Sequence, residues 1–498
     1  MRPSVFLASL LFVSTPLLAA APSADAVSTA RYAVDTYQGA LVDSLARMVS
    51  FNTVADKDVP AERNPQHLGF KRYLKEQADL LGLDFADHGM VVVIGLGKGS
   101  ERIGFITHGD VQPVDPAKWK QSPFELDRTS EPGRLLGRGT EDDKAPIATA
   151  MYAMKAIRDR QLPLTRRLEL YVYMAEESDW DPLTEFLKTH VPPQMNLTFD
   201  AEYPAVIAEK GWGVVQPSFA PVSPAGVRGP VLVTFQGGFF ASQIPEDARA
   251  VIANATPALV ARIRARAARQ PGMHYTFALQ GKQLTIGARG VSAHSSKPED
   301  GRNAISQLAD ALQVHAWPPQ GAGALVNFLN EMVGTGLYGE RFGRIAYRDD
   351  FMGPMTFVPT VIKDTPQGQE LTINLRRPRG KSGAVLEAQI RAAAAQWQTR
   401  HRPLAALKVQ LSEPWVQDDA PQLPTLLGVF SHYTGVRDPA PIAIGGGTNS
   451  RLFPHAVAFG PAMPGAVYSG HSEHEFITTR QLLLNLEMVT AVMIDLAR

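Results

Sequence analysis

Residues 103–113 read IGFITHGDVQP, an apolar run that ends at His108 and is followed two positions later by Asp110. An apolar run of this length predicts a buried β-strand. In an extended chain, residues i and i+2 lie on one face, so the Asp110 carboxylate is expected beside the His108 imidazole. A carboxylate in that position can orient an imidazole that binds a metal ion. The same pair also occurs incidentally at strand ends, so the rest of the chain must decide between the two interpretations.

A second strand-like run, at residues 168–174, leads directly into the paired acids Glu176 and Glu177. Between the two runs, residues 147–158 have helical spacing and are rich in Ala and Met. Strands that alternate with helices predict an α/β layered sheet. The acids would then lie at the carboxyl edge of the sheet, where such folds bind ligands. Burying them unpaired would be costly, so they indicate a functional site more strongly than His108 and Asp110 do.

The pattern of the chain changes near residue 210. Strand-like and helical segments follow each other with a core of their own, at residues 231–235, 258–268, 275–279, 283–288, 303–314 and 383–397. We therefore predict a two-domain, mixed-sheet α/β protein. Residues 27–210 and 381–498 would form the α/β domain, and residues 211–380 would form an inserted α+β domain.

Residues 1–26 have the pattern of a secretory signal peptide. Arg2 precedes an apolar run over residues 5–18, and small residues follow through Ala26. The run is shorter than the roughly 20 residues of a transmembrane helix, and no later segment is apolar for long enough. A buried N-terminal helix is the alternative. We expect an exported protein without a membrane anchor, periplasmic if the source is Gram-negative. Cleavage after Ala21 would leave Pro22 first, so cleavage after Ala20 or Ala26 is expected at least equally.

The composition excludes several classes of protein and site. The 498 residues are 45% hydrophobic and 20% charged, which is typical of a globular protein. Lys+Arg 49 balances Asp+Glu 49, so nothing favours binding to nucleic acid or to an anionic membrane. The cysteine count is 0, which excludes disulfides, thiolate metal sites and a cysteine nucleophile. Any metal must therefore be held by His, Asp and Glu.

Three further segments supply such residues. GRGTEDDKAP, at residues 137–146, contains Asp142, although a run of acids also suits a solvated turn or a helix cap. NLTFDAEYP contains Asp200, and SGHSEHEFI contains His471 in a stretch whose Gly and Ser favour a loop. Together with the first two segments, they form a sulfur-free ligand set. It suits two zinc, manganese or cobalt ions about 3.5–4 Å apart that share a carboxylate and a water.

The motifs also occur in the order of a known family. They are H-x-D, G-R-G-x-x-D-D-K, E-E-S, D-A-E-Y-P with E-K-G, G-x-x-A-H-x-x-x-P-x-x-G-x-N-A-I, G-G-G-T and H-x-x-x-E-F-I. The chain resembles the co-catalytic dinuclear zinc metallopeptidases, which include bacterial dipeptidases, carnosinase, aminoacylase and glutamate carboxypeptidase. It is most similar to the long-lid dipeptidase branch. The motifs extend over nearly the whole chain after residue 26.

The resemblance implies two divalent metal ions, with Zn²⁺ expected and Mn²⁺ or Co²⁺ as alternatives. His108 and Asp200 would hold one ion, Glu177 and His471 would hold the other, and Asp142 would bridge them.

The resemblance also implies a role for the neighbours of these ligands. Asp110 would orient His108, and the peptide bond between Asp142 and Asp143 would be cis. Glu176 would be the general base, which takes a proton from the attacking water and returns it to the departing amine.

Substrate-binding residues come from the inserted domain, which by resemblance is a lid. His294, in residues 290–305, would stabilise the developing oxyanion, although taken alone it would better suit a core or surface position in a turn. Arg376, in INLRRP, would bind the substrate carboxylate. The loop IGGGTNS contains Gly446, Gly447, Thr448 and Asn449, whose backbone amides can hold a carboxylate or carbonyl oxygen.

We therefore expect a metal-dependent exopeptidase that hydrolyses dipeptides or short peptides through a metal-bridging water. An N-acyl amino acid amidohydrolase or a carboxypeptidase of the same family is the alternative. A non-catalytic exported binding protein is a different class, disfavoured because the ligands and Glu176 are all present. The expected partner is a small peptide. The protein would be a monomer or a homodimer, with the monomer preferred because the long-lid branch acts within one chain.

Overall fold

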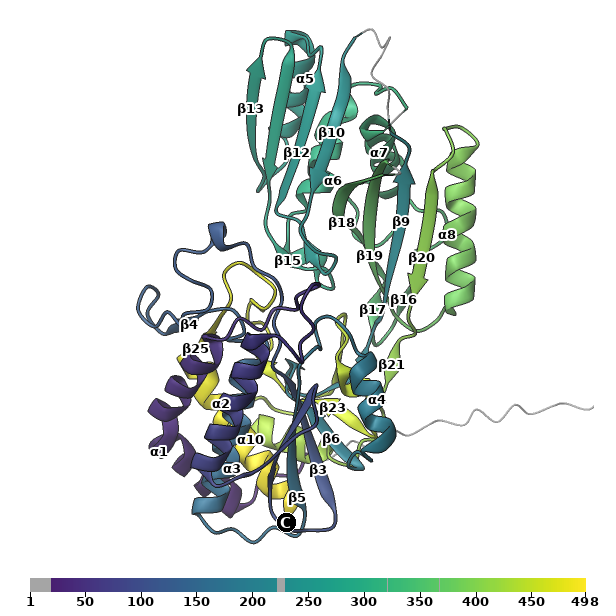
Figure 1. Cartoon of the computed structure of the whole chain (residues 1–498). Coiled ribbons are helices and arrows are strands. Elements are labelled where there is room, and N and C mark those ends of the chain that lie inside the picture. Colours follow the sequence, from purple (N-terminus) through teal and green to yellow (C-terminus); the bar gives the residue numbers. More distant parts are fainter. Residues whose placement is uncertain (1–18, 222–228, 320, 367) are drawn as a thin grey trace, which may run out of the picture.

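The computed structural model describes residues 19–221, 229–319, 321–366 and 368–498. Two bodies are stacked end to end, each built around its own sheet (Figure 1). Both termini of the described chain lie in the first body, which is made of residues before 210 and after 412. The predicted two-domain α/β architecture with an inserted lid is confirmed.

A nine-stranded mixed sheet forms the catalytic domain. Its strands, in spatial order, are β1 (Asp84–Asp87), β2 (Val91–Leu96), β5 (Arg167–Tyr173), β3 (Arg102–His108), β6 (Met195–Thr198), β23 (Ala456–Ala458), β8 (Val206–Glu209) and β21 (Trp415–Val416), with β22 (Ile442–Ile444) also paired to β8. The central strands β5, β3, β6 and β23 are parallel. Their carboxyl ends therefore meet at one edge, and this edge faces the lid (Figure 1).

Helices cover both faces of this sheet. One face packs against α1 (Ala24–Val49), α2 (Pro65–Leu81), α3 (Lys144–Asp159), α9 (Leu423–Thr434) and α10 (Thr479–Ala497), and the other against α4 (Asp181–Thr189). The local sequence sets the helix ends. Asn64 caps the first turn of α2, and Gly82 ends that helix in a left-handed conformation with φ 68°. No helix among the described residues is both long and apolar enough to cross a membrane.

The lid is an eight-stranded antiparallel sheet. Its strands, in spatial order, are β13 (His274–Gln280), β14 (Gln283–Arg289), β12 (Asp247–Ala253), β10 (Val231–Gly237), β18 (Thr356–Thr365), β19 (Gly368–Arg377), β9 (Gly211–Phe219) and β20 (Ala406–Leu411). Helices α5 (Pro257–Ala267), α6 (Ala304–Ala311), α7 (Ala322–Phe328) and α8 (Gly383–Gln398) pack on it to form a separate core. Gly211, at the crossing into the lid, has no room for a side chain, since a Cβ there would lie 2.3 Å from the Ser412 carbonyl oxygen.

Short strand pairs connect loops around the junction of the two domains. They are β4 (Arg134–Leu136) with β25 (Phe476–Thr478), β7 (Ala201–Glu202) with β24 (Pro461–Ala462), β11 (Gln243–Ile244) with β15 (Ala293–His294), and β16 (Arg348–Asp349) with β17 (Gly353–Pro354). The pair β4–β25 brings the segment before Asp142 alongside the segment after His471.

Two boundaries differ from the sequence-based expectation. The lid does not end at residue 380, because α8 packs on the lid sheet and β20 pairs with β9 of that sheet. The catalytic domain resumes at β21, which pairs with β8. At the other end of the chain, residues 1–18 of the expected signal peptide lie outside the described residues. Helix α1 already begins at Ala24 and buries Ala26, inside the expected 1–26 segment.

Candidate metal centre and active site

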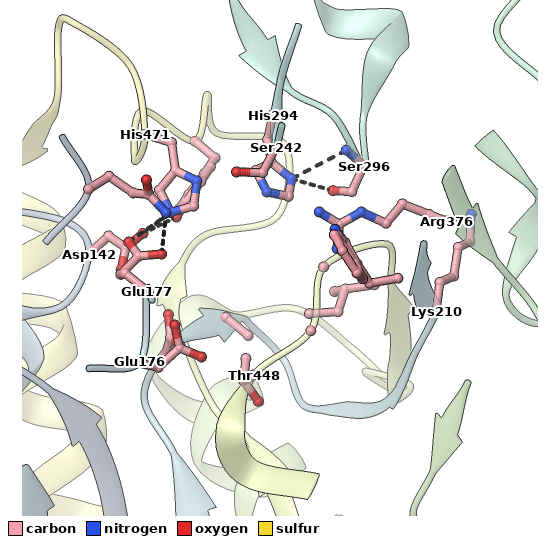
Figure 2. Close-up of a pocket in the computed structure, with 18 of the residues that line it drawn as sticks. Asp142, Glu176, Glu177, Lys210, Ser242, His294, Ser296, Arg376, Thr448 and His471 are labelled. Carbon is pink, nitrogen blue, oxygen red and sulfur yellow. Dashed lines mark hydrogen bonds and ion pairs between the residues drawn. The ribbon is translucent and has the colours of Figure 1, made fainter. Parts of the chain in front are cut away.

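All five expected metal ligands lie together at the carboxyl edge of the parallel strands. His108 ends β3, Glu177 follows β5, and Asp200 follows β6. Asp142 lies just before α3, and His471 lies on the loop before β25. Figure 2 shows Asp142, Glu177 and His471 pointing toward one another, with Glu176 beside them. The fold therefore brings the five predicted ligand residues together at one edge of the sheet.

Asp142 has the central position in the cluster. Its Oδ1 lies 2.8 Å from His108 Nε2, and its Oδ2 lies 3.0 Å from His471 Nε2. His108 Nε2 is also 3.9 Å from Asp200 Oδ1, and His471 Nε2 is 3.0 Å from Glu177 Oε1. Each oxygen of Asp142 thus faces one imidazole together with one further carboxylate. A carboxylate in this position is able to contact two cations at once.

The carboxylate of Asp110 has a different main contact from the one expected. His108 Nδ1 lies 3.0 Å from the main-chain oxygen of Asp110 and 3.6 Å from its carboxylate. The two carboxylate oxygens instead accept the backbone N–H groups of Glu176 at 2.9 Å and Glu177 at 3.0 Å. Asp110 therefore orients His108 chiefly through its backbone, and its side chain holds the paired acids in place.

The acids strongly perturb one another. Exclusion of water, together with the charges of Asp142 and Glu177, raises the pKa of Asp200 to about 6, although His108 opposes this shift. Burial also lowers the pKa of His471, but the carboxylates of Glu177 and Asp142 outweigh it and raise that pKa to about 10. Without cations, the cluster would thus need protons to balance its negative charge.

The donor set fits divalent cations. Ligand atoms of His108, Asp142 and Glu177 lie within 4.8 Å of one another, as do those of His108, Glu176 and Asp200. Imidazole and carboxylate donors without sulfur suit zinc, manganese or cobalt. The peptide bond between Asp142 and Asp143 is cis, as the family resemblance implied.

Glu176 lies beside the predicted metal-ligand residues and is not one of the five. Its Oε1 is buried and has no hydrogen-bond partner among the described residues. Burial, followed by the charge of Asp200, raises the pKa of its carboxyl well above the usual value. A carboxyl group with a raised pKa and a free oxygen is suited to exchanging protons with a substrate.

The lid supplies His294 and Arg376 from the opposite side of the cavity (Figure 2). The ring of His294 lies 5.3 Å, centroid to centroid, from that of His471 in the same chain. The Ser296 amide donates to His294 Nδ1 at 3.3 Å, so the proton of a neutral ring lies on Nε2. Burial and the positive charge of Arg376 lower the pKa of His294 well below its usual value, which keeps the ring neutral.

Arg376 is a buried cation without an acidic partner among the described residues. Its Nε donates to Asn374 Oδ1 at 3.2 Å, and its Nη2 donates to Ser295 Oγ at 3.4 Å. Burial lowers its pKa to about 10, so the guanidinium remains charged at neutral pH. A buried charge that lacks a partner in the protein is suited to an anionic ligand group.

The glycine-rich loop is only partly available to a ligand. Gly446, Gly447 and Thr448 line the cavity, whereas Asn449 is buried and does not. The Thr448 N–H and hydroxyl both donate to Glu209 Oε1, at 3.0 and 2.7 Å. The Thr448 amide is therefore already occupied, and binding by this loop would depend on the other backbone groups.

These residues enclose a cavity of about 590 Å³ between the catalytic domain and the lid. Metal-ligand residues lie at one end and Arg376 at the other, with His294 between them (Figure 2). This size falls within the range of small-molecule sites.

Two contacts in the site were not anticipated from the sequence. Tyr468 donates from its hydroxyl to Asp142 Oδ2 at 2.7 Å, and Gln112 donates to Glu177 Oε2 at 2.7 Å. Tyr468 lies three residues before His471 and Gln112 two residues after Asp110, so both are close in sequence to recognised motifs. Proximity to a motif was the only available signal, because neither residue type is itself a typical metal ligand.

Fold and site together define a metal-dependent hydrolase with a split catalytic domain and an inserted lid. The profile of Peptidase family M20/M25/M40 matches residues 104–495. The chain therefore belongs to this family of peptidases, and the resemblance noted from its motifs is confirmed.

Curated relatives are similar in sequence over most of the chain, and a solved structure is similar in fold. The chain is 29% identical over 471 residues to "Putative dipeptidase YtjP" of Bacillus subtilis, covering 92% of this chain and 97% of that protein. It is 28% identical to "Beta-Ala-Xaa dipeptidase" of Lactobacillus delbrueckii subsp. lactis, covering 81% of this chain and 84% of that protein. The fold is similar to human carnosine dipeptidase 1, with a TM-score of 0.58 and 15% identity over 96% of this chain and 99% of the other.

Proposed function

We propose that this protein is a dipeptidase that hydrolyses unblocked dipeptides at a pair of divalent metal ions, with zinc as the expected metal. The observation that carries the proposal is the buried Arg376, which has no acidic partner in the described part of the chain and faces the metal-ligand cluster across a small cavity. A short peptide can place its scissile bond at the cluster and its terminal carboxylate at Arg376. Relatives named as dipeptidases support the same substrate class.

The residues of the site have distinct tasks in this reaction. Two divalent ions at the cluster would polarise the scissile carbonyl and lower the pKa of the attacking water. Glu176 accepts the proton of that water and delivers it to the departing amine. His294 donates a hydrogen bond from Nε2 to the developing oxyanion, and Arg376 fixes the carboxyl end of the substrate.

A substrate panel separates this proposal from its alternatives. Purified protein would be given free dipeptides, the same dipeptides with acetylated N-termini, and N-acyl amino acids, each with Zn²⁺ and with a chelator. We expect hydrolysis of the free dipeptides, loss of activity with chelator and its return with added metal. Preference for acylated substrates would favour an amidohydrolase or carboxypeptidase. No metal binding and no turnover on any substrate would favour a binding protein.

We also propose that the protein is exported, with periplasmic location if the source is Gram-negative. The contacts of Ser23 support cleavage at a site before this residue. Its side chain caps α1 and its hydroxyl donates to Asp495 at 2.5 Å, so Ser23 is part of the folded domain. Cleavage after Ala26 would remove this cap, whereas cleavage after Ala20 would keep it. Mass measurement of the secreted protein is expected to show Ala21 as the first residue. A first residue of Val27, or an uncleaved and unexported chain, would contradict the proposal.

A further inference from the structure

Two loops hold ligands that must be kept at a fixed spacing. The first, residues 137–143, carries Asp142, and the second, residues 468–475, carries His471. The loops are more than 300 residues apart in the sequence, yet Asp142 Oδ2 and His471 Nε2 are 3.0 Å apart. Each loop also contains a buried acid that is not a predicted metal ligand and that faces the other loop, Glu141 in the first and Glu475 in the second. Asp143, the other buried acid of the first loop, instead accepts the backbone N–H of His108 at 3.1 Å.

Glu475 of the second loop binds the backbone of the first. Its Oε1 accepts the N–H groups of Gly139 at 3.0 Å, Glu141 at 2.9 Å and Asp142 at 3.1 Å. Its Oε2 accepts from Arg138 Nη1 at 2.7 Å. Both side chains of this ion pair are almost completely buried. The carboxylate therefore holds the turn that presents Asp142.

Glu141 of the first loop binds the second in the same manner. Its Oε2 accepts the N–H of Ser469 at 2.6 Å, the hydroxyl of Ser469 at 2.7 Å and the N–H of Gly470 at 3.2 Å. Gly470 directly precedes His471. Each loop thus supplies a buried carboxylate that accepts the backbone N–H groups of the other.

His471 needs such support, because its backbone is in an unfavourable conformation. Its φ is 63°, in the left-handed region that residues with a side chain seldom adopt. A conformation of this kind persists only where the surroundings enforce it. Glu141 binds the two residues before His471, and is therefore placed to enforce it.

We propose that Glu141 and Glu475 form a reciprocal carboxylate clasp. The clasp positions Asp142 and His471 for the metal ion that Glu177 and His471 would hold, called here the second ion. Glu141 and Glu475 are positioning residues and do not touch substrate. Loss of the Glu141 carboxylate should lower the affinity for the ion held by Glu177 and His471 more than the affinity for the ion held by His108 and Asp200. The inference rests on the ligand roles proposed above.

The test uses Zn²⁺ affinity, measured on the metal-free full chain by competition with a chromophoric chelator. Glu141→Ala should leave the affinity for one ion unchanged and lower the affinity for the other by roughly tenfold or more. A loss of this size is usual when a residue that orients a metal ligand is removed. Glu141→Gln keeps an oxygen that can accept the same three hydrogen bonds, so it should retain most of the affinity. His471→Ala is the reference variant, because it removes a ligand of the second ion and shows how the titration changes when that ion is lost.

Glu169→Gln is the matched control. Glu169 is also a buried acid, and it accepts hydrogen bonds from Tyr171 at 2.7 Å and Arg102 at 3.0 Å, but it lies at the start of β5, away from the ligands. It should bind two ions as the wild type does, even if its thermal stability falls.

If a folded Glu141→Ala protein binds both zinc ions with unchanged affinity, the proposal is wrong. An equal loss of affinity for both ions would also contradict it. If that variant does not fold, Ser469→Ala removes one of the three donors and should still weaken the second ion alone, whereas unchanged binding would overturn the proposal. A wild-type chain that binds no zinc would instead contradict the proposed function. The two failures are therefore distinguishable.

Discussion

Among single residues, Arg376 most directly determines which substrates the site accepts. Arg376→Lys keeps the charge but loses the planar pair of donors that matches a carboxylate. We expect KM for free dipeptides to rise by roughly tenfold to a hundredfold, since a hydrogen bond to a charged group contributes about 1.5–3 kcal/mol. Dipeptide amides are the matched substrates, because they have no terminal carboxylate and should show little change. An equal rise in KM for the amides would contradict the assigned role.

Residue types and their order along the chain predicted which side chains would hold metal, because a metal site without cysteine can use few kinds of side chain. His108, Asp142 and Glu177 each carry a possible donor, but only the combination of all the motifs in family order pointed to a metal site. The carboxylate contacts of Asp110 and the role of Glu141 could not be predicted in this way. Both depend on which backbone N–H groups the tertiary fold places within hydrogen-bond distance of a carboxylate, and the local sequence does not determine this.

At the scale of elements, the parallel strands explain why the site was predictable. An apolar run that ends in a polar ligand indicates the carboxyl end of a strand, and such ends meet in an α/β sheet. The end of the lid was harder to place. Strand β20 belongs to the lid only because it pairs with β9, which begins at Gly211. Pairing between segments so far apart has no local signature.

Ion pairs between the lid and the catalytic domain lead to a prediction about substrate binding. Lys118, on the catalytic domain, lies 2.7 Å from both Glu246 and Asp247 of the lid. Lys118→Met should weaken this contact between the lid and the catalytic domain and raise KM about two- to fivefold, because partly exposed pairs contribute up to about 1 kcal/mol. High salt should reduce the difference between variant and wild type.

Lys75→Met provides the control for this prediction. Lys75 makes an ion pair of the same length, 2.7 Å, but with Asp79 within α2 and far from the lid. Its KM should equal that of the wild type at every salt concentration. A similar rise in KM for both variants would show that the effect is not due to lid contacts.

For the whole molecule, the position of His294 makes the site complete within one chain. Its ring lies 5.3 Å from that of His471 of the same chain, so no second copy is needed to supply it. We propose a catalytically competent monomer. Specific activity should stay constant on dilution, and light scattering should give the mass of one chain. Activity that falls on dilution, together with a dimer that dissociates, would contradict this.

The most direct test of the whole account combines zinc content with turnover in Glu176→Gln. Because Glu176 lies beside the predicted metal ligands and its Oε1 has no hydrogen-bond partner within the described ranges, the variant should keep two zinc ions per chain and the wild-type fold. Its kcat on a free dipeptide should fall by about 10²–10⁴-fold, the usual contribution of a general base. A variant with two bound ions and near-normal kcat would contradict the proposed mechanism.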